Sequence, residues 1–566
     1  MKKTVSVLLS FVMIISILTA LPFTAHALPA SGECGENTTY KFDSSSGTLT
    51  IGGTGEITFN SFRDKSEVKK VVINNGLLSI EDYAFSNCKS LTEIYIPSSV
   101  EYISDLAFVE CSNLSKITVA SKNKTYDSRK NCNAIIKKRD STLILGCKNT
   151  KIPDGIDSIG SCAFLGCIGL KSISIPNTVT YIETSAFEGT GITNLTVPAS
   201  VKDISETAFA YCANLSKITV ASKNKTYDSR KNCNAIIKKR GNILFIGCKN
   251  TKILKGIKGI DAYAFSGCAG LRNISIPNTV TYIGASAFEG TGITNLTIPD
   301  SVTKIEEAAF MNCKELNFVK LPKNINKIDY ETFANCTNLQ NVVIPKSVKD
   351  IEVTAFCKQT YSDGVLEEND RVILSGVSFW YYGSKSSWNS IYFSKYTFSV
   401  DDEYDDEGSF YYDTADKSWV NAYTSKAHFN YKEHEHKWNN KFSKQPTFKA
   451  EGIKSCTCST CKMKFTNVPC NKLVSPTVSK LKAGKKQFTA NWKKAPTVAG
   501  YQIQYATNAK FKKAKKVTVK KAGTIKKTFK KLKSRKKYYV RVRAYKTING
   551  KKVYSPWSKS KTVKTK

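Results

Sequence analysis

The stretch that decides the fold is IPSSVEYISDLAFVECSNL, residues 96–114, because its apolar positions recur along most of the chain. Its Ala-Phe pair, or a Thr-Phe variant, occurs ten times, and successive Phe residues are 22, 23 or 56 positions apart. The repeated residues are Phe85, Phe108, Phe164, Phe187, Phe209, Phe265, Phe288, Phe310, Phe333 and Phe356. A fixed period of this length predicts a stacked array of one structural unit.

Each copy contains the pattern of a short strand. Alternate residues such as Ile94 and Ile96 lie on one face of an extended segment, and Val100, Ile103 and Phe108 return the chain across a shared core. One such coil cannot bury its own apolar face, whereas stacked coils can. The period therefore predicts a leucine-rich-repeat solenoid with a parallel β-sheet along its concave side.

Two steps of 56 residues each contain an insertion. Residues 115–139 and 216–240 are identical, so the array grew by duplication of a unit of 101 residues. Within the first copy, residues 133–139 and 142–146 read as two strands joined by a turn, which predicts a hairpin that projects from the coil.

The pattern Ile-Pro-x-Ser-Val-x-x-Ile-x-x-x-Ala-Phe-x-x-Cys-x-x-Leu resembles the BspA-like leucine-rich repeat family of bacterial surface proteins. The similarity covers about residues 34–431, with Cys34 in a segment like the family's N-terminal cap and Trp380 and Trp388 in one like its C-terminal cap. It implies a surface protein that binds rather than catalyses. The acidic, aromatic stretch 394–424 departs from the usual cap and is either a loop or a binding element.

Residues 473–566 are the source of much of the positive charge. The chain has a net charge of +39, and this segment holds 30 Lys and Arg and no Asp or Glu. Its alternating strands, with Trp492, Leu532 and Tyr538, resemble a fibronectin type III sandwich with a tyrosine corner. Arg541 and Arg543 are expected to point outward and to stack on Trp557 of the last strand.

The start of the chain predicts export. Lys2 and Lys3 precede an apolar run at 5–21 and the small residues Ala25 and Ala27, as in a secretory signal peptide. No later segment is long and apolar enough to span a membrane. We expect a signal peptide at 1–27, an N-terminal cap at 28–67, leucine-rich repeats at 68–357, a C-terminal cap with an acidic aromatic insertion at 358–431, a Cys/His module or linker at 432–472 and the fibronectin type III domain at 473–566.

Cysteines fall into three groups. Seven of 18 lie three residues after a repeat Phe, which predicts a buried ladder. Cys132 with Cys147, and Cys233 with Cys248, flank the hairpins, where they form either disulfides or apolar packing. In the small module, candidate zinc ligands are His436, Cys458 and Cys461, with disulfides as the alternative. No other cofactor is expected.

Enzyme motifs are missing. The sequence contains no phosphate-binding Gly-rich loop, nucleophile elbow or paired-carboxylate motif, and it has only four His. We therefore expect a non-catalytic, adhesin-like protein at the cell surface or outside the cell, with a structural spacer as the alternative. The side chains expected to face out of the concave sheet are Tyr95, Thr118, Ser174, Thr196, Thr219, Ser275, Thr297 and Lys320.

The concave face and the basic domain predict two kinds of binding partner. The mostly small, hydroxylated face suits an extracellular protein or a polysaccharide, and repeated patches suit multivalent contacts. The basic domain suits an anionic cell-wall polymer, with a generic solvated surface as the alternative. Missing base-reading motifs and predicted export argue against nucleic acid.

Overall fold

The computed structural model describes residues 27–359, 371–374, 376–399, 409–414, 417–429, 431–432, 438–444, 452–460, 462–470, 476–495, 498–548 and 551–566. The predicted signal peptide therefore lies outside the described residues, apart from Ala27. The chain forms two compact units, residues 1–432 and 433–566. In the described part of the chain, no helix has the length and apolar character needed to cross a membrane.

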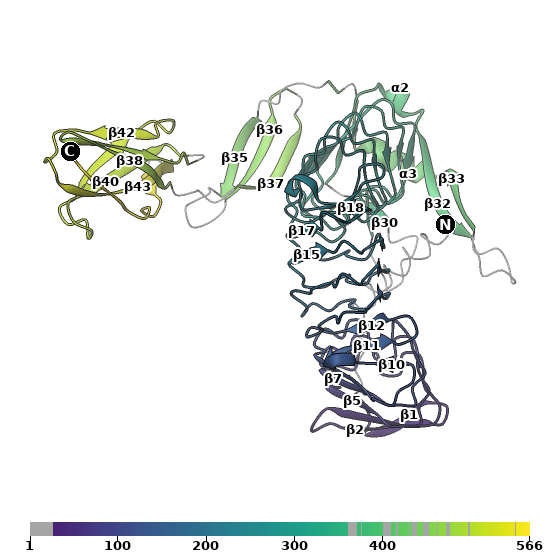
Figure 1. The fold of residues 1–566 in the computed structure, drawn as a ribbon. Helices are drawn as coiled ribbons and strands as arrows, with labels where there is room; N and C mark the ends of the chain where they lie inside the picture. Colours follow the sequence, from purple (N-terminus) through teal and green to yellow (C-terminus); the bar gives the residue numbers. More distant parts are fainter. Residues whose placement is uncertain are drawn as a thin grey trace. The chain divides into compact units, whose positions relative to one another are not determined.

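The first unit is a β-solenoid of about 13 turns over residues 48–351. Its predicted parallel sheet is a row of strands that we call the front wall, and a second row of mostly two-residue strands forms the back wall (Figure 1). Front-wall strands are β3 (Thr48–Gly53), β5 (Lys70–Ile73), β7 (Glu93–Ile96), β9 (Lys116–Val119), β15 (Asn194–Val197), β17 (Lys217–Val220), β23 (Asn295–Thr297), β25 (Phe318–Lys320), β27 (Asn341–Ile344), β31 (Ser378–Tyr381) and β34 (Ala427–His428).

The back wall contains β4 (Glu56–Ile57), β6 (Ser79–Ile80), β8 (Tyr102–Ile103), β13 (Ser158–Ile159), β14 (Tyr181–Ile182), β16 (Asp203–Ile204), β21 (Gly259–Ile260), β22 (Tyr282–Ile283), β24 (Lys304–Ile305), β26 (Lys327–Ile328) and β28 (Asp350–Glu352). Within each wall, neighbouring strands are parallel and in register. Ile94 pairs with Ile117 in the front wall, and Ile159 pairs with Ile182 in the back wall. Each Ile points into the core, so the two walls enclose one apolar interior.

Stacked phenylalanines fill the corner between the walls. The rings of Phe62, Phe85 and Phe108 lie 5.3 and 5.0 Å apart and within 13° of parallel. Further stacks follow at 164, 187 and 209 and at 265, 288, 310, 333 and 356. All ten repeat Phe residues are buried. Aromatic stacking thus repeats the same contact from coil to coil.

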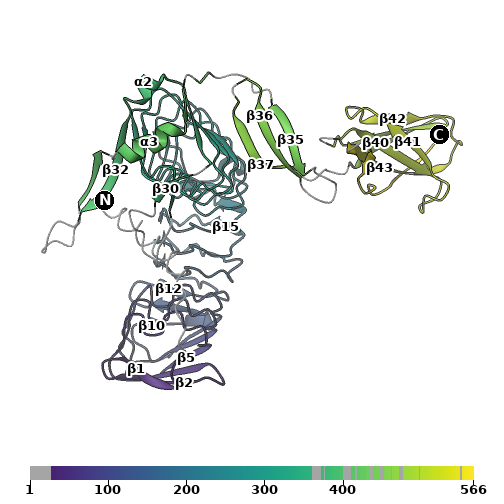
Figure 2. The same ribbon diagram turned by 180° about the vertical axis from the view of Figure 1, so that it is seen from behind.

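The array is closed at both ends (Figure 2). At the start, β1 (Ser31–Gly35) pairs antiparallel with β2 (Thr38–Asp43), and β2 pairs antiparallel with β3, so the first coil is covered. At the other end lie β29 (Cys357–Gln359), β30 (Arg371–Ile373), α2 (Lys385–Trp388), β32 (Tyr392–Ser399), β33 (Ser409–Thr414) and α3 (Lys417–Ser425). Described parts of the 394–424 stretch are thus a hairpin and a helix, and the loop interpretation is wrong there. Tyr423 of α3 is buried and its hydroxyl donates to the Val353 carbonyl at 2.9 Å.

The insertions form hairpins, but these do not project. In the first copy, β11 (Ala134–Lys137) pairs antiparallel with β10 (Tyr126–Asp127) and β12 (Thr142–Gly146). β12 also pairs in parallel with β13, so the hairpin is built into the back wall. The second copy repeats this with β18 (Tyr227–Asp228), β19 (Ile236–Lys238), β20 (Ile243–Ile246) and β21. Projection was the wrong expectation because the hairpin's apolar residues are core residues.

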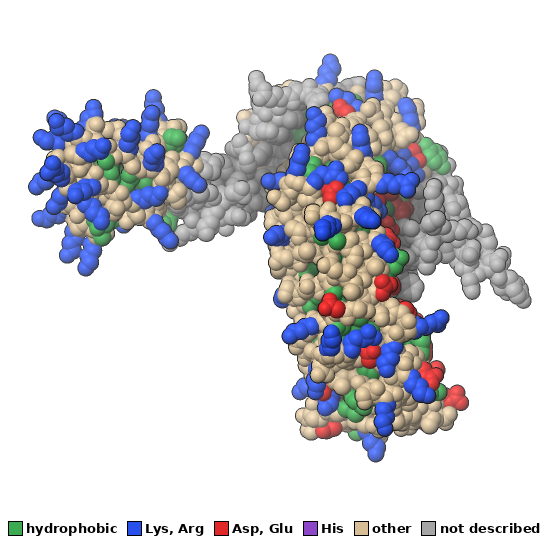
Figure 3. Space-filling view, in the orientation of Figure 1, with side chains coloured by type: hydrophobic (Ala, Val, Ile, Leu, Met, Phe, Trp, Pro, Cys, Tyr) green, Lys and Arg blue, Asp and Glu red, His purple; other side chains and the backbone are tan. Residues whose placement is uncertain are grey.

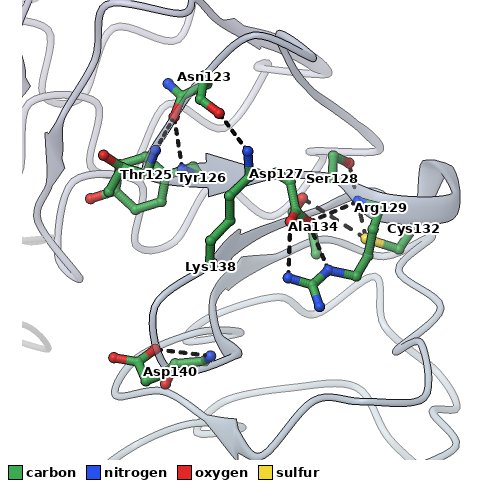
Figure 4. Close-up of polar contacts among 11 residues, drawn as sticks. Asn123, Thr125, Tyr126, Asp127, Ser128, Arg129, Cys132, Ala134, Lys138 and Asp140 are labelled. Carbon is green, nitrogen blue, oxygen red and sulfur yellow. Dashed lines mark hydrogen bonds and ion pairs between the residues drawn. The ribbon is translucent and has the colours of Figure 1, made fainter.

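A buried asparagine fixes the entry into each insertion (Figure 4). The Asn123 amide donates to the Pro97 and Val100 carbonyls at 2.7 and 2.9 Å, and its oxygen accepts from the backbone N–H groups of Thr125 and Tyr126. Asn224 makes the equivalent contacts. Each amide is therefore satisfied in the core and ties the insertion to the preceding coil.

The predicted cysteine ladder is confirmed. Thiols donate to the carbonyl of the Phe one coil earlier, as from Cys111 to Phe85 at 3.1 Å and from Cys212 to Phe187 at 3.1 Å. Burial raises the pKa of Cys111 and Cys212 to about 12, because a thiolate in this core would lose its hydration.

The hairpin disulfides are not formed in this structure. Cys132, Cys147, Cys233 and Cys248 are free thiols. Cys132 packs with the coils that follow the hairpin, whereas Cys147 packs with the coils that precede it and approaches the Asn133 carbonyl at 3.4 Å. The two side chains of a pair thus pack in different parts of the core.

In its described residues, the second unit contains β-strands and no helix. A meander of β35 (Trp438–Lys444), β36 (Gly452–Cys458) and β37 (Lys464–Cys470) precedes two antiparallel sheets. One sheet contains β38 (Val478–Gly484), β39 (Gln487–Trp492) and β42 (Lys526–Phe529). The other contains β40 (Gly500–Ala506), β41 (Lys515–Val519), β43 (Lys537–Ile548), β44 (Lys551–Tyr554) and β45 (Lys561–Lys564). Their inner faces share a core that includes Trp492, Ile503 and Val542.

We predict that the Phe stack carries much of the solenoid's stability. Phe288→Ala should lower the free energy of unfolding by roughly 3–5 kcal/mol, because a fully buried ring leaves a cavity between two stacked neighbours. Urea denaturation followed by circular dichroism measures this. Phe59→Ala is the control, since Phe59 is 60% exposed and its loss should cost less than about 0.5 kcal/mol. Equal costs for the two variants would contradict the stacking account.

Two duplicated glutamates predict a pH dependence. Glu188 and Glu289 are buried at equivalent corners, and burial raises the pKa of Glu188 to about 7 and raises that of Glu289. The carboxyl is therefore held protonated in the fold, and stability decreases as pH rises from about 4.5 through about 7. Glu188→Gln should leave stability unchanged at pH 4 and increase it by up to about 3 kcal/mol at pH 8. Chemical denaturation at both pH values tests this; exposed Glu101→Gln should show no such trend.

Candidate binding face of the solenoid

The structure brings the predicted concave residues to one face, the front wall. Tyr95 pairs with Thr118, Thr196 with Thr219, and Thr297 with Lys320. Tyr95, Ser174, Thr196, Ser275 and Thr297 are exposed, and Thr118, Thr219 and Lys320 are half-buried. The face is divided into blocks, because segments 171–175 and 272–276 continue the wall without strand pairing.

Hydroxyl groups, together with Asn194, Lys171 and Lys217, form the exposed surface of the middle block. Thr196 and Thr219 lie side by side, with their hydroxyl oxygens hydrogen-bonded at 3.0 Å. Ser172 and Ser174 are exposed on the preceding segment. Such a surface offers hydrogen-bond donors and acceptors but no apolar pocket.

The first block is charged. Glu93 on β7 lies between Lys70 and Lys116, at 3.7 and 2.7 Å. The hydrogen bond from Lys116 holds the pKa of the Glu93 carboxyl below its usual range. These exposed pairs add little stability, but they neutralise the acidic group of this block.

Sequence reasoning missed two loops that reach the front wall. The short 3₁₀ helices η1 (Arg129–Asn131) and η2 (Arg230–Asn232) follow β10 and β18. The Ser128 hydroxyl donates to the Ile117 carbonyl of β9 at 3.3 Å, and the Ser229 hydroxyl accepts from the Val220 N–H of β17 at 2.9 Å. In Figure 1 both helices lie on the same side of the array as β7 and β17. The exact duplication was visible in the sequence, but the direction of these loops was not.

Each loop carries one paired and one unpaired cation. Arg129 forms a fork on Asp127, with Nε to Oδ1 and Nη2 to Oδ2 both at 2.9 Å (Figure 4). Arg230 and Asp228 repeat this arrangement. Lys130 and Lys231 are exposed, and within the described residues neither has a carboxylate within 4.0 Å. Both have a positive φ, 55° and 54°.

A groove lies on the back wall beside the first insertion. It has a volume of about 450 Å³ and is lined by Tyr102, Asp105, Lys137 and Cys162, among others. Burial, followed by the charge of Glu183, raises the pKa of Asp105. In the second copy Tyr263 replaces Cys162, so the two copies differ here.

The zinc prediction remains untested. Cys458 is buried at the end of β36, where its N–H donates to the Met463 carbonyl at 2.9 Å. His436 and Cys461 lie outside the described residues. Among residues that the structure does describe, no group of three His, Cys, Asp or Glu is placed to hold a metal ion.

The basic unit presents cations on both sheets. Lys480 and Lys526 lie opposite Asn491 on the outer strands of one sheet. On the other sheet, the predicted stacking is confirmed, because the guanidinium carbons of Arg541 and Arg543 lie 4.9 and 4.3 Å from the Trp557 ring centre. Figure 3 shows Lys and Arg spread over the visible face of this unit.

The comparisons with known proteins agree with the repeat. A family model described as BspA type leucine rich repeat region matches in six copies, over residues 43–138, 144–239 and 238–362. No curated protein matches the chain.

The solved structures that match parts of this chain include leucine-rich proteins of bacteria. A leucine rich cell surface protein of Faecalibacterium prausnitzii is 25% identical, over 64% of this chain and 98% of that one, with a TM-score of 0.39. A leucine-rich repeat protein of Eubacterium ventriosum is 23% identical, over 59% and 90%, with a TM-score of 0.38. The pneumococcal vaccine antigen PcpA is 17% identical, over 65% and 96%, with a TM-score of 0.35. Since the family model covers more than half of the sequence, this chain belongs to the BspA type leucine rich repeat family.

Proposed function

We propose that this chain is an exported, non-catalytic binding protein of a cell surface, and that the front wall of its solenoid is the recognition surface. The observation that carries the proposal is the composition of that wall. Between residues 148 and 320, the strands and connecting segments that belong to the front wall contain no Asp or Glu. They expose Ser, Thr, Asn, Lys and Arg side chains. A surface of this kind offers many hydrogen bonds to an extended ligand.

The proposal assigns a second role to the basic unit. We take residues 473–566 to be a fibronectin type III domain, supported by two antiparallel sheets around a common core and by the Tyr538 hydroxyl, which accepts from the Lys533 N–H at 3.2 Å. With 30 cations and no carboxylate, this domain is suited to hold the protein on an anionic cell-wall polymer.

A structural spacer without a specific ligand is the alternative function. It is favoured by the stacking itself, because a solenoid closed at both ends is stable without any partner. The two functions differ in one observable property, saturable binding.

We predict saturable binding of the mature chain, residues 28–566, to at least one member of an array of extracellular proteins and glycans. Thr196→Tyr should weaken that binding at least tenfold, because a bulky ring would cover the hydroxyl surface of β15. Lys202→Tyr is the matched control, since Lys202 is exposed one residue before β16 on the back wall. If no probe binds saturably, the spacer function is supported instead.

The attachment role predicts a salt dependence. The mature chain should sediment with isolated cell walls at 0.02 M salt and be released at about 1 M, where the screening length falls to roughly 3 Å. A chain ending at residue 472 should stay in the supernatant at both salt concentrations. Retention that does not change with salt, or retention of the shortened chain, would contradict electrostatic attachment by residues 473–566.

A further inference from the structure

We propose that the part of the front wall between η1 and η2 binds a linear anionic polysaccharide, with one basic loop at each end of the bound segment. This inference rests on the proposed function and narrows its ligand class.

The two loops form a matched pair. They belong to insertions that are identical over 25 residues, each with eight Lys or Arg and one Asp. On the front wall, segment 148–152 follows β9, with residues 132–133 of the insertion partly between them, and segment 171–175, β15 and β17 come next. Four to five strand spacings of about 4.8 Å therefore separate the loops, so equivalent cations lie roughly 19–24 Å apart. A linear anionic chain of at least this length would contact both loops.

The surface between the loops favours a sugar chain. Its exposed groups are hydroxyls and amides, including Ser172, Ser174, Asn194 and Thr196, together with the ammonium groups of Lys151, Lys171 and Lys217. Sugar hydroxyls exchange hydrogen bonds with groups of this kind, as donors and as acceptors. The wall segments 148–152, 171–175, 194–197 and 217–220 contain no aromatic residue. Single-stranded nucleic acids are held by aromatic stacking in addition to phosphate contacts, and protein partners by aromatic or apolar anchors, so both fit this surface less well.

The charges lie where an anionic chain needs them. Asp127 and Asp228 are the carboxylates of the two loops, and each is neutralised by its own arginine. Lys130 and Lys231 remain as exposed cations at the ends of the hydroxyl surface. Carboxylate or sulfate groups on a polysaccharide would pair with these lysines while the sugars between them lie on β15 and segment 171–175. Two weak contacts on one chain add by multivalency.

The test uses the full mature chain, a length series of sulfated oligosaccharides and a matching series of carboxylated ones. Hydrogen exchange of peptides that include Lys171 and Ser172 is the readout, because the duplicated unit has Arg272 and Asn273 there, whereas residues 173–182 are identical to 274–283. Such peptides report on the solenoid and not on the basic domain. We expect both series to protect segment 171–175, and protection to rise sharply once the oligosaccharide spans both loops. Response to only one series identifies the source of the anionic group.

Two double variants locate the site. Lys130→Asp with Lys231→Asp should reduce protection of 171–175 at least tenfold at a fixed concentration, and Asp tolerates the positive φ at these positions. Lys122→Asp with Lys223→Asp changes the charge equally in the same insertions, at exposed corner positions, and should leave protection within about twofold.

Several results would overturn the inference. An equal loss of protection in both double variants would mean that only net charge matters. Protection that does not depend on the length of the oligosaccharide would contradict binding to both loops. If Thr196→Tyr abolishes binding of another ligand while no oligosaccharide protects 171–175, the proposed function stands and the polysaccharide inference fails.

Discussion

Everything in the solenoid depends on one constraint: a single coil of this chain cannot bury its own apolar face. Within each stack, a Phe ring packs against the Phe ring of the next coil, at 5.0 to 5.3 Å. The same dependence holds in the walls, where Ile94 and Ile117 are neighbours in space although 23 residues separate them. Burial is therefore shared between coils, and the two ends need covers, which β1, β2 and α3 provide.

The insertions change this regular array without breaking it. β11 adds an antiparallel strand to the back wall, and the Phe stack stops at Phe108 and resumes at Phe164. Gly146 allows the change, because a Cβ there would lie 2.0 Å from the Phe164 ring. The same geometry carries η1 to the front wall, where it presents Lys130. The insertion thus places a positive charge on the proposed recognition surface, and its duplicate places a second one there.

The sequence was sufficient to predict the coils, the core cysteines and the outward-facing residues of the front wall. These features follow from the periodicity of the sequence, because side chains along a strand are alternately buried and exposed. Ile94 and Ile96 are buried, and Tyr95 between them is exposed. The insertions were harder to predict, because a hairpin has the same local pattern whether it projects or pairs with the next coil. The pairing of β12 with β13 involves distant residues and has no local signal. For the same reason, the positions of η1, η2 and the free Cys132 thiol were visible only in the structure.

The most direct test of the central claim, recognition by the front wall, is a crystal structure of the mature chain grown with a sulfated oligosaccharide long enough to span both loops. The account predicts sugar density along β15 and segment 171–175, with anionic groups near Lys130 and Lys231. Density on the back wall, or only on residues 473–566, would contradict it.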